Sequence, residues 1–145
     1  MTSESDHKHF AIQSYSLCWE LLVRERTDEE NRNLVGAALT SRYHWRHVGG
    51  KQEKAIADWM ASRAFAMIGE ANLAKVFAEA SMLYDDGSFP AWLRASLLEG
   101  LARAHHVSGE FERRDLYVSQ ALAELERERD AEDVELIRQQ LSDLT

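Results

Sequence analysis

Cysteine and proline are nearly missing from this chain of 145 residues, which contains only Cys18 and Pro90 of these two types. A single cysteine excludes an intrachain disulfide, and this fits a reducing compartment such as the cytoplasm. Valine, isoleucine and threonine are also sparse, whereas residues that favour helices dominate. The composition therefore predicts an all-α protein with a cytoplasmic location.

Long apolar runs and an excess of positive charge are lacking as well. No apolar run approaches the ~20 residues of a bilayer-spanning helix, so we expect no membrane segment. Residues 1–9 are polar and lack the apolar stretch of a signal peptide, and we expect them to form a flexible N-terminus. The net charge is −8, whereas the negative phosphates of nucleic acids attract positively charged proteins, so no nucleic-acid partner is expected.

Helical periodicity divides residues 10–145, which we expect to form a single domain, into about seven helices. The expected helices cover about 10–24, 28–48, 52–68, 71–84, 90–107, a segment after Gly109 and a last segment after Asp130. In the first helix, Ile12, Tyr15 and Trp19 form a second apolar stripe, which predicts contacts on two sides. Short loops pair the helices as three antiparallel hairpins followed by a closing C-terminal helix.

Two glycines mark the turns of two similar helix pairs. Gly69 and Gly109 each end an amphipathic pattern, each is followed by glutamate, and a new helical pattern starts at once. Glycine adopts the left-handed conformation that commonly ends a helix. We therefore predict two helix–turn–helix units, and units of this kind stack into solenoids.

The two units resemble tetratricopeptide repeats, whose first helix carries an aromatic and small residues, with glycine at the turn and alanines on the second helix. The first unit offers Trp59, Ser62, Phe65, Gly69, Ala74 and Ser81, and the second Leu98, Leu101, Ala102, Gly109, Phe111 and Ala121. This resemblance covers roughly half of the chain and implies a right-handed superhelix of divergent repeats, although the glycines are 40 residues apart rather than about 34. Arg114 and His105 also depart from the family pattern. An ordinary bundle of helical hairpins is the alternative.

The resemblance implies that the first helices of the repeats line a concave surface. It assigns to this groove Trp59, Met60, Arg63, Met67, Glu99, Arg103 and His106, with Ile56, Ser96 and Gly100 beside them. Helical spacing agrees, because Trp59 and Arg63 are four residues apart, as are Glu99 and Arg103. An arginine fork suits a carboxylate of a bound peptide, whereas the same residues could instead form a buried ion-pair network.

Catalytic and metal-binding motifs are not found. The sequence has no HExxH, phosphate-binding loop, GxGxxG or GxSxG, and His44 and His47 have a metal-ligand spacing without an identifiable third ligand. We expect neither metal nor cofactor, and predict a non-enzymatic module that binds a protein or peptide in a concave groove. One alternative is a small-molecule binder or enzyme with a pocket around Trp59, Arg63, Glu99 and Arg103. Another is a homo-oligomeric scaffold, such as a homodimer.

Overall fold

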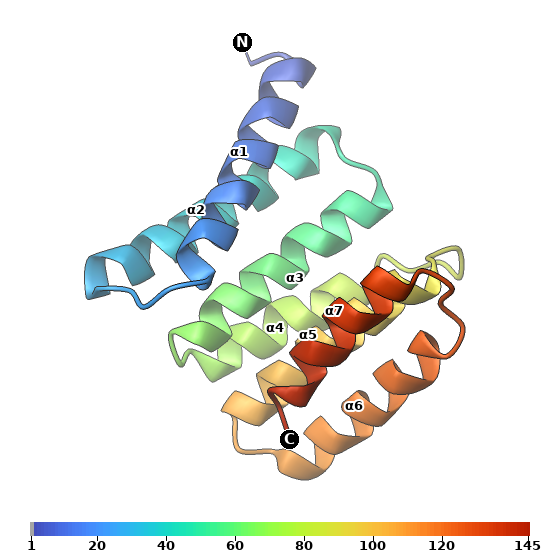
Figure 1. Cartoon of the computed structure of the whole chain (residues 1–145). Coiled ribbons are helices and arrows are strands. Elements are labelled where there is room, and N and C mark those ends of the chain that lie inside the picture. Colours follow the sequence, from blue (N-terminus) through green and yellow to red (C-terminus); the bar gives the residue numbers. More distant parts are fainter. Residues whose placement is uncertain (1) are drawn as a thin grey trace.

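The computed structural model describes residues 2–145, and every regular element within that range is a helix (Figure 1). The seven helices are α1 (Glu4–Leu22), α2 (Asp28–Val48), α3 (Lys51–Met67), α4 (Ala71–Met82), α5 (Ala91–Val107), α6 (Phe111–Leu125) and α7 (Ala131–Ser142). The all-α prediction is confirmed. None of these described helices combines the length and the apolar character that crossing a bilayer requires.

The first helix begins earlier than the sequence predicts. The Ser3 hydroxyl accepts the backbone N–H of Asp6 at 3.1 Å, and Glu4 and Asp6 place negative charge in the first turn of α1. This side-chain cap and these charges stabilise a helix N-terminus. The expectation of a flexible segment over 1–9 is therefore corrected for residues 4–9, which belong to α1, while Met1 lies outside the described residues.

The two predicted glycine turns have the same geometry. Gly69 has a φ of +83° and Gly109 a φ of +75°, so both occupy the left-handed region as predicted. After each glycine, the N–H of the following glutamate donates to a carbonyl five residues back, from Glu70 to Phe65 and from Glu110 to His105, at 2.9 Å in both cases. This pattern satisfies carbonyls that the helix end leaves free.

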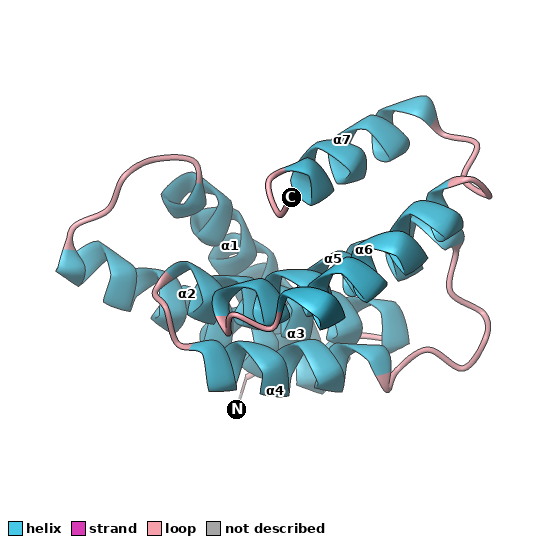
Figure 2. Ribbon diagram, turned by 90° about the horizontal axis from the view of Figure 1, so that it is seen from below, coloured by secondary structure: helices cyan, strands magenta, loops and turns pink. Residues whose placement is uncertain are grey.

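Three hairpins, α1–α2, α3–α4 and α5–α6, pack side by side in two layers (Figures 1 and 2). The first helices α1, α3 and α5 contact one another in sequence order and form one layer. Serine hydroxyls link helices within the hairpins, because Ser41 donates to the carbonyl of Ala11 and Ser62 to that of Ala74, both at 2.8 Å. Small side chains at these positions allow the paired helices to approach closely.

The closing helix α7 packs mainly on α5 and less on α6, its neighbour in the sequence. Figure 2 shows α7 lying over the layer of first helices, with α1 rising on the opposite side. Ile137, Leu141 and Leu144 are buried against the part of the core built from α3 to α6. Side chains of α1, α3, α5 and α7 together line a groove, in which α3 and α5 form the floor and α7 forms one wall.

Candidate functional site

Trp59, Arg63, Glu99 and Arg103, here called the Glu99 cluster, meet between α3 and α5. The Trp59 indole N–H donates to Glu99 Oε2 at 3.1 Å, while Arg103 Nε and Arg63 Nη1 donate to Oε1 at 2.8 and 3.5 Å. Glu99 is 0% exposed. The structure therefore brings together the four residues that the sequence predicts to share a face, with the carboxylate of Glu99 at their centre.

A glycine makes room for this arrangement. A methyl group placed on Gly100 would lie 2.7 Å from Cδ1 of Trp59, closer than atoms of this kind approach. The bare backbone at Gly100 thus lets the indole of Trp59 lie directly against α5. The sequence predicts Gly100 at the groove surface, whereas the structure buries it beneath the tryptophan.

The two arginines are held by the protein itself. The side chains of Arg63 and Arg103 are only 14% and 11% exposed, and both share the carboxylate of Glu99. The guanidinium of Arg63 also lies over the rings of Trp19 and Trp59, 5.4 and 5.8 Å from their centres. Burial lowers the pKa of Arg63, and the charge of Glu99 opposes that shift. Because both arginines are mostly buried and paired with Glu99, this geometry supports the ion-pair network rather than a free carboxylate-binding site.

The other predicted groove residues lie elsewhere. Met60 is 0% exposed in the core, so its assignment to the groove surface is wrong. Met67 is exposed at the end of α3 and is absent from the cavity wall described below. His106 packs against Phe111 and lies 3.1 Å from Arg114, measured from Nδ1 to Nη1, which places it against α6 and away from Glu99.

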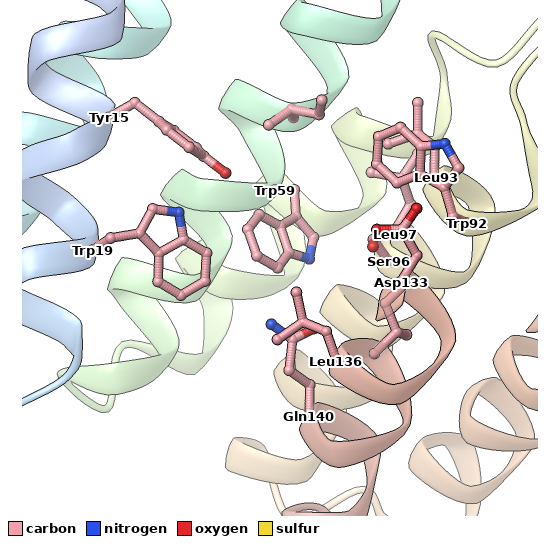
Figure 3. A pocket seen from close by; sticks show the side chains of 12 residues that line it. Tyr15, Trp19, Trp59, Trp92, Leu93, Ser96, Leu97, Asp133, Leu136 and Gln140 are labelled. Atoms are coloured by element: carbon pink, nitrogen blue, oxygen red, sulfur yellow. The ribbon is translucent and has the colours of Figure 1, made fainter. Parts of the chain in front are cut away.

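Beside the Glu99 cluster lies a cavity of about 160 Å³ between α1, α3, α5 and α7, here called the aromatic cavity (Figure 3). Its wall consists of Tyr15, Trp19, Ile56, Trp59, Trp92, Leu93, Ser96, Leu97, Asp133, Leu136, Ile137 and Gln140. Three of the four tryptophans of the chain are among them. In Figure 3, Trp59 stands between the α1 side chains Tyr15 and Trp19 on one side and Leu136 and Gln140 of α7 on the other.

The rings of the cavity meet at steep angles. Tyr15 and Trp19 are arranged edge to face, with centres 6.4 Å apart, and Trp19 and Trp59 are tilted by 42° with centres 5.9 Å apart. Polar atoms enter the wall only from Tyr15, Ser96, Asp133, Gln140 and the indoles. Burial raises the pKa of Tyr15, so its hydroxyl is neutral and can both donate and accept hydrogen bonds.

The groove residues expected from the sequence include Ile56, Trp59 and Ser96 of this wall, whereas most of the other wall residues were not expected there. The second apolar stripe of the first helix, with Tyr15 and Trp19, was the signal that α1 is contacted from two sides. The contribution of α7 had no such signal, because periodicity shows which face of a helix is apolar and not which helix covers it.

A second buried carboxylate, Asp58, lies in α3 and is 1% exposed. It forms an ion pair with Arg42 of α2, whose guanidinium also lies 5.4 Å from the centre of the Phe77 ring. Burial raises the pKa of Asp58 even though Arg42 and Arg46 favour its charged form. No sequence motif marks this pair, because its members are 16 residues apart on different helices.

The histidines of the first hairpin form a separate cluster. His7 Nδ1 lies 2.8 Å from His44 Nδ1, and the rings of His7 and His47 are stacked with centres 4.2 Å apart. Burial and the neighbouring histidines lower the pKa of His44. Across residues 2–145, no group of three or more histidine, cysteine or acidic side chains is arranged to hold a metal ion.

No family model, curated protein or solved structure matches this chain. The geometry of the aromatic cavity and its surroundings is therefore what bears on the function.

Proposed function

We propose that this protein is a non-enzymatic binding module that holds a segment of a protein or peptide in the groove between α1 and α7. The observation that carries the proposal is the aromatic cavity, which lies in the floor of that groove and is walled by three tryptophans. Tryptophan and tyrosine rings are enriched among the residues that dominate protein interfaces, because each offers a large contact area at little cost in side-chain entropy, and Tyr15, Trp19 and Trp92 are partly exposed here. We infer that one side chain of the partner enters this cavity.

The size of the cavity favours a side chain over a whole small molecule. Its volume of about 160 Å³ is below the roughly 300–1,000 Å³ of pockets that enclose a drug-sized ligand. The cavity is partly open to solvent, so one side chain can enter it while the rest of the partner stays outside. A substrate pocket formed by the Glu99 cluster is less well supported, because Glu99 is buried and both arginines are paired with it.

Filling the cavity tests this proposal. Ser96 lines the cavity from α5, and Ser96→Phe would place a ring in the space that the partner side chain needs. Ser119→Phe makes the same change at an exposed position of α6 and serves as the matched control. Peptides would be selected from a displayed random library on the wild-type protein, and their affinities for both variants would be measured.

We expect the selected peptides to bind Ser119→Phe like the wild type and to bind Ser96→Phe at least about tenfold more weakly, the effect of losing a central anchor. Circular dichroism and thermal melts of both variants establish that the helices remain folded. Peptides that retain their affinity for a folded Ser96→Phe protein would contradict the proposal, and so would a library that yields no binder.

A further inference from the structure

We infer that the aromatic cavity selects a basic side chain, a lysine or an arginine of the partner. This inference rests on the proposed function and specifies its ligand. It depends on the rings that line the cavity, on one carboxylate without a partner in its wall and on the charge around it.

The aromatic rings offer binding faces for a cation. Tryptophan is the best cation–π partner among the side chains, followed by tyrosine and phenylalanine. Trp19 and Trp59 already show this preference, because the guanidinium of Arg63 lies over both rings at 5.4 and 5.8 Å. Arg63 itself is not part of the cavity wall, whereas Trp19 and Trp59 are, so both indoles present part of their surface to the cavity.

Asp133 supplies the matching charge. It belongs to the cavity wall and comes from the first turn of α7. Two nearby acidic side chains have partners: Glu128 accepts the backbone N–H of Trp92 at 3.0 Å, and Asp130 accepts the N–H groups of Glu132 and Asp133 at 2.9 and 3.2 Å. Within residues 2–145, neither an ion pair nor a hydrogen bond engages the carboxylate of Asp133. Asp133 is thus the only acidic side chain in the cavity wall, and no counter-ion is paired with it.

The surroundings increase the attraction for a cation. Burial raises the pKa of Asp133, and the negative charges of Asp130, Glu128 and Glu132 raise it further, in that order. A positive group bound beside Asp133 would oppose this rise in pKa, because it would favour the charged carboxylate. The net charge of −8 also draws basic segments toward the protein from a distance.

The shape of the wall suits a side chain with an apolar stem and a charged end. Leu136 and Ile56 offer aliphatic surface, and Asp133 and Ser96 offer oxygen acceptors. Lysine and arginine bury their methylene stems against apolar surface while the charged end keeps polar contacts. An acidic side chain would meet Asp133 and no arginine in the wall, since Arg63 and Arg103 lie outside it and both pair with Glu99.

Three small probes separate the possibilities: the Nα-acetyl methylamides of lysine, norleucine and glutamate, titrated in the millimolar range. The indole N–H signals of the four tryptophans would be followed by ¹H–¹⁵N NMR. Trp19, Trp59 and Trp92 line the cavity, whereas Trp45 does not and serves as an internal control. We expect the lysine probe to shift the three cavity signals and leave that of Trp45 unchanged.

The variant Asp133→Asn tests the role of charge, with Glu132→Gln as its matched control, because Glu132 loses the same charge in the same turn without lining the cavity. We expect Asp133→Asn to weaken lysine binding by roughly fivefold or more, to the level of norleucine, and Glu132→Gln to leave it nearly unchanged. Added salt is expected to weaken only the lysine probe.

The outcomes distinguish this inference from the proposed function. If norleucine shifts the cavity signals as strongly as lysine, and Asp133→Asn has no effect, the cavity accepts an apolar side chain and the basic preference is wrong. A preference for the glutamate probe overturns the inference in the same way. If none of the three probes shifts the cavity signals, the inference and the side-chain binding role of the cavity both fail.

Discussion

Two carboxylates are buried to the same degree in this protein, yet their surroundings differ. Glu99 of α5 receives hydrogen bonds from Trp59, Arg63 and Arg103, so two helices contribute donors to it. Asp58 of α3 is paired with Arg42, and burial nonetheless raises its pKa. Burial alone therefore does not reveal the role of a charged group, because the number of donors that surround it decides whether its charge stabilises the fold.

The largest effect is expected when the charge of Glu99 is removed. Glu99→Gln would leave Arg63 and Arg103 close together, mostly buried and without a counter-ion, and should lower the free energy of unfolding by about 3–5 kcal/mol. Chemical denaturation followed by circular dichroism measures this loss. Glu79→Gln, the same change at an exposed position of α4, is the control. A loss below about 1 kcal/mol, typical of exposed ion pairs, would show that the cluster is not needed for stability.

A medium effect is expected when the approach of Trp59 to Glu99 is blocked. Gly100→Ala places a methyl group against the indole and should cost about 1–3 kcal/mol through overpacking. Gly36→Ala in α2 is the matched control, because nothing lies within 4 Å of the added methyl group there. Since alanine favours helices more than glycine, this control should be neutral or stabilising. Equal effects of the two changes in thermal melts would contradict the close contact between Trp59 and Gly100.

The smallest effect is expected for Asp58, and it should depend on pH. Because the folded-state pKa is raised, the protonated form stabilises the fold below about pH 4, and this contribution is lost as the pH rises through the folded-state pKa. Asp58→Asn removes this titration, so the wild type should lose stability relative to the variant as the pH rises. Urea denaturation of both proteins across this range measures the difference. If the wild type instead gains stability relative to Asp58→Asn as the pH rises, Arg42 more than offsets the cost of burying the charged carboxylate.

The sequence was sufficient for much of the fold and for part of the site. The turns at Gly69 and Gly109 were predictable because a left-handed helix end strongly favours glycine. The Glu99 cluster was predictable because two pairs of residues four apart, placed on equivalent helices of stacked units, must face each other. These features depend on local rules that a single sequence contains.

The remaining features depend on contacts between distant segments. Met60 has the same helical spacing as the predicted groove residues Arg63 and Met67, but it is fully buried in the core, and periodicity alone could not show this. Asp58 and Arg42 meet across different helices without a motif. The aromatic cavity could be predicted only if the packing of α7 on α5 were known. The amphipathic pattern of α7 would equally fit packing on α6.

The walls of the aromatic cavity come from nearly the whole length of the chain, from Tyr15 in α1 to Gln140 in α7. During synthesis the hairpins can form one after another, since each depends on contacts between neighbouring segments. The cavity cannot exist until the residues up to Gln140 have been made and α7 has returned to α5. During synthesis and folding, the site for a partner would thus be completed only after the helices that form the floor of the groove.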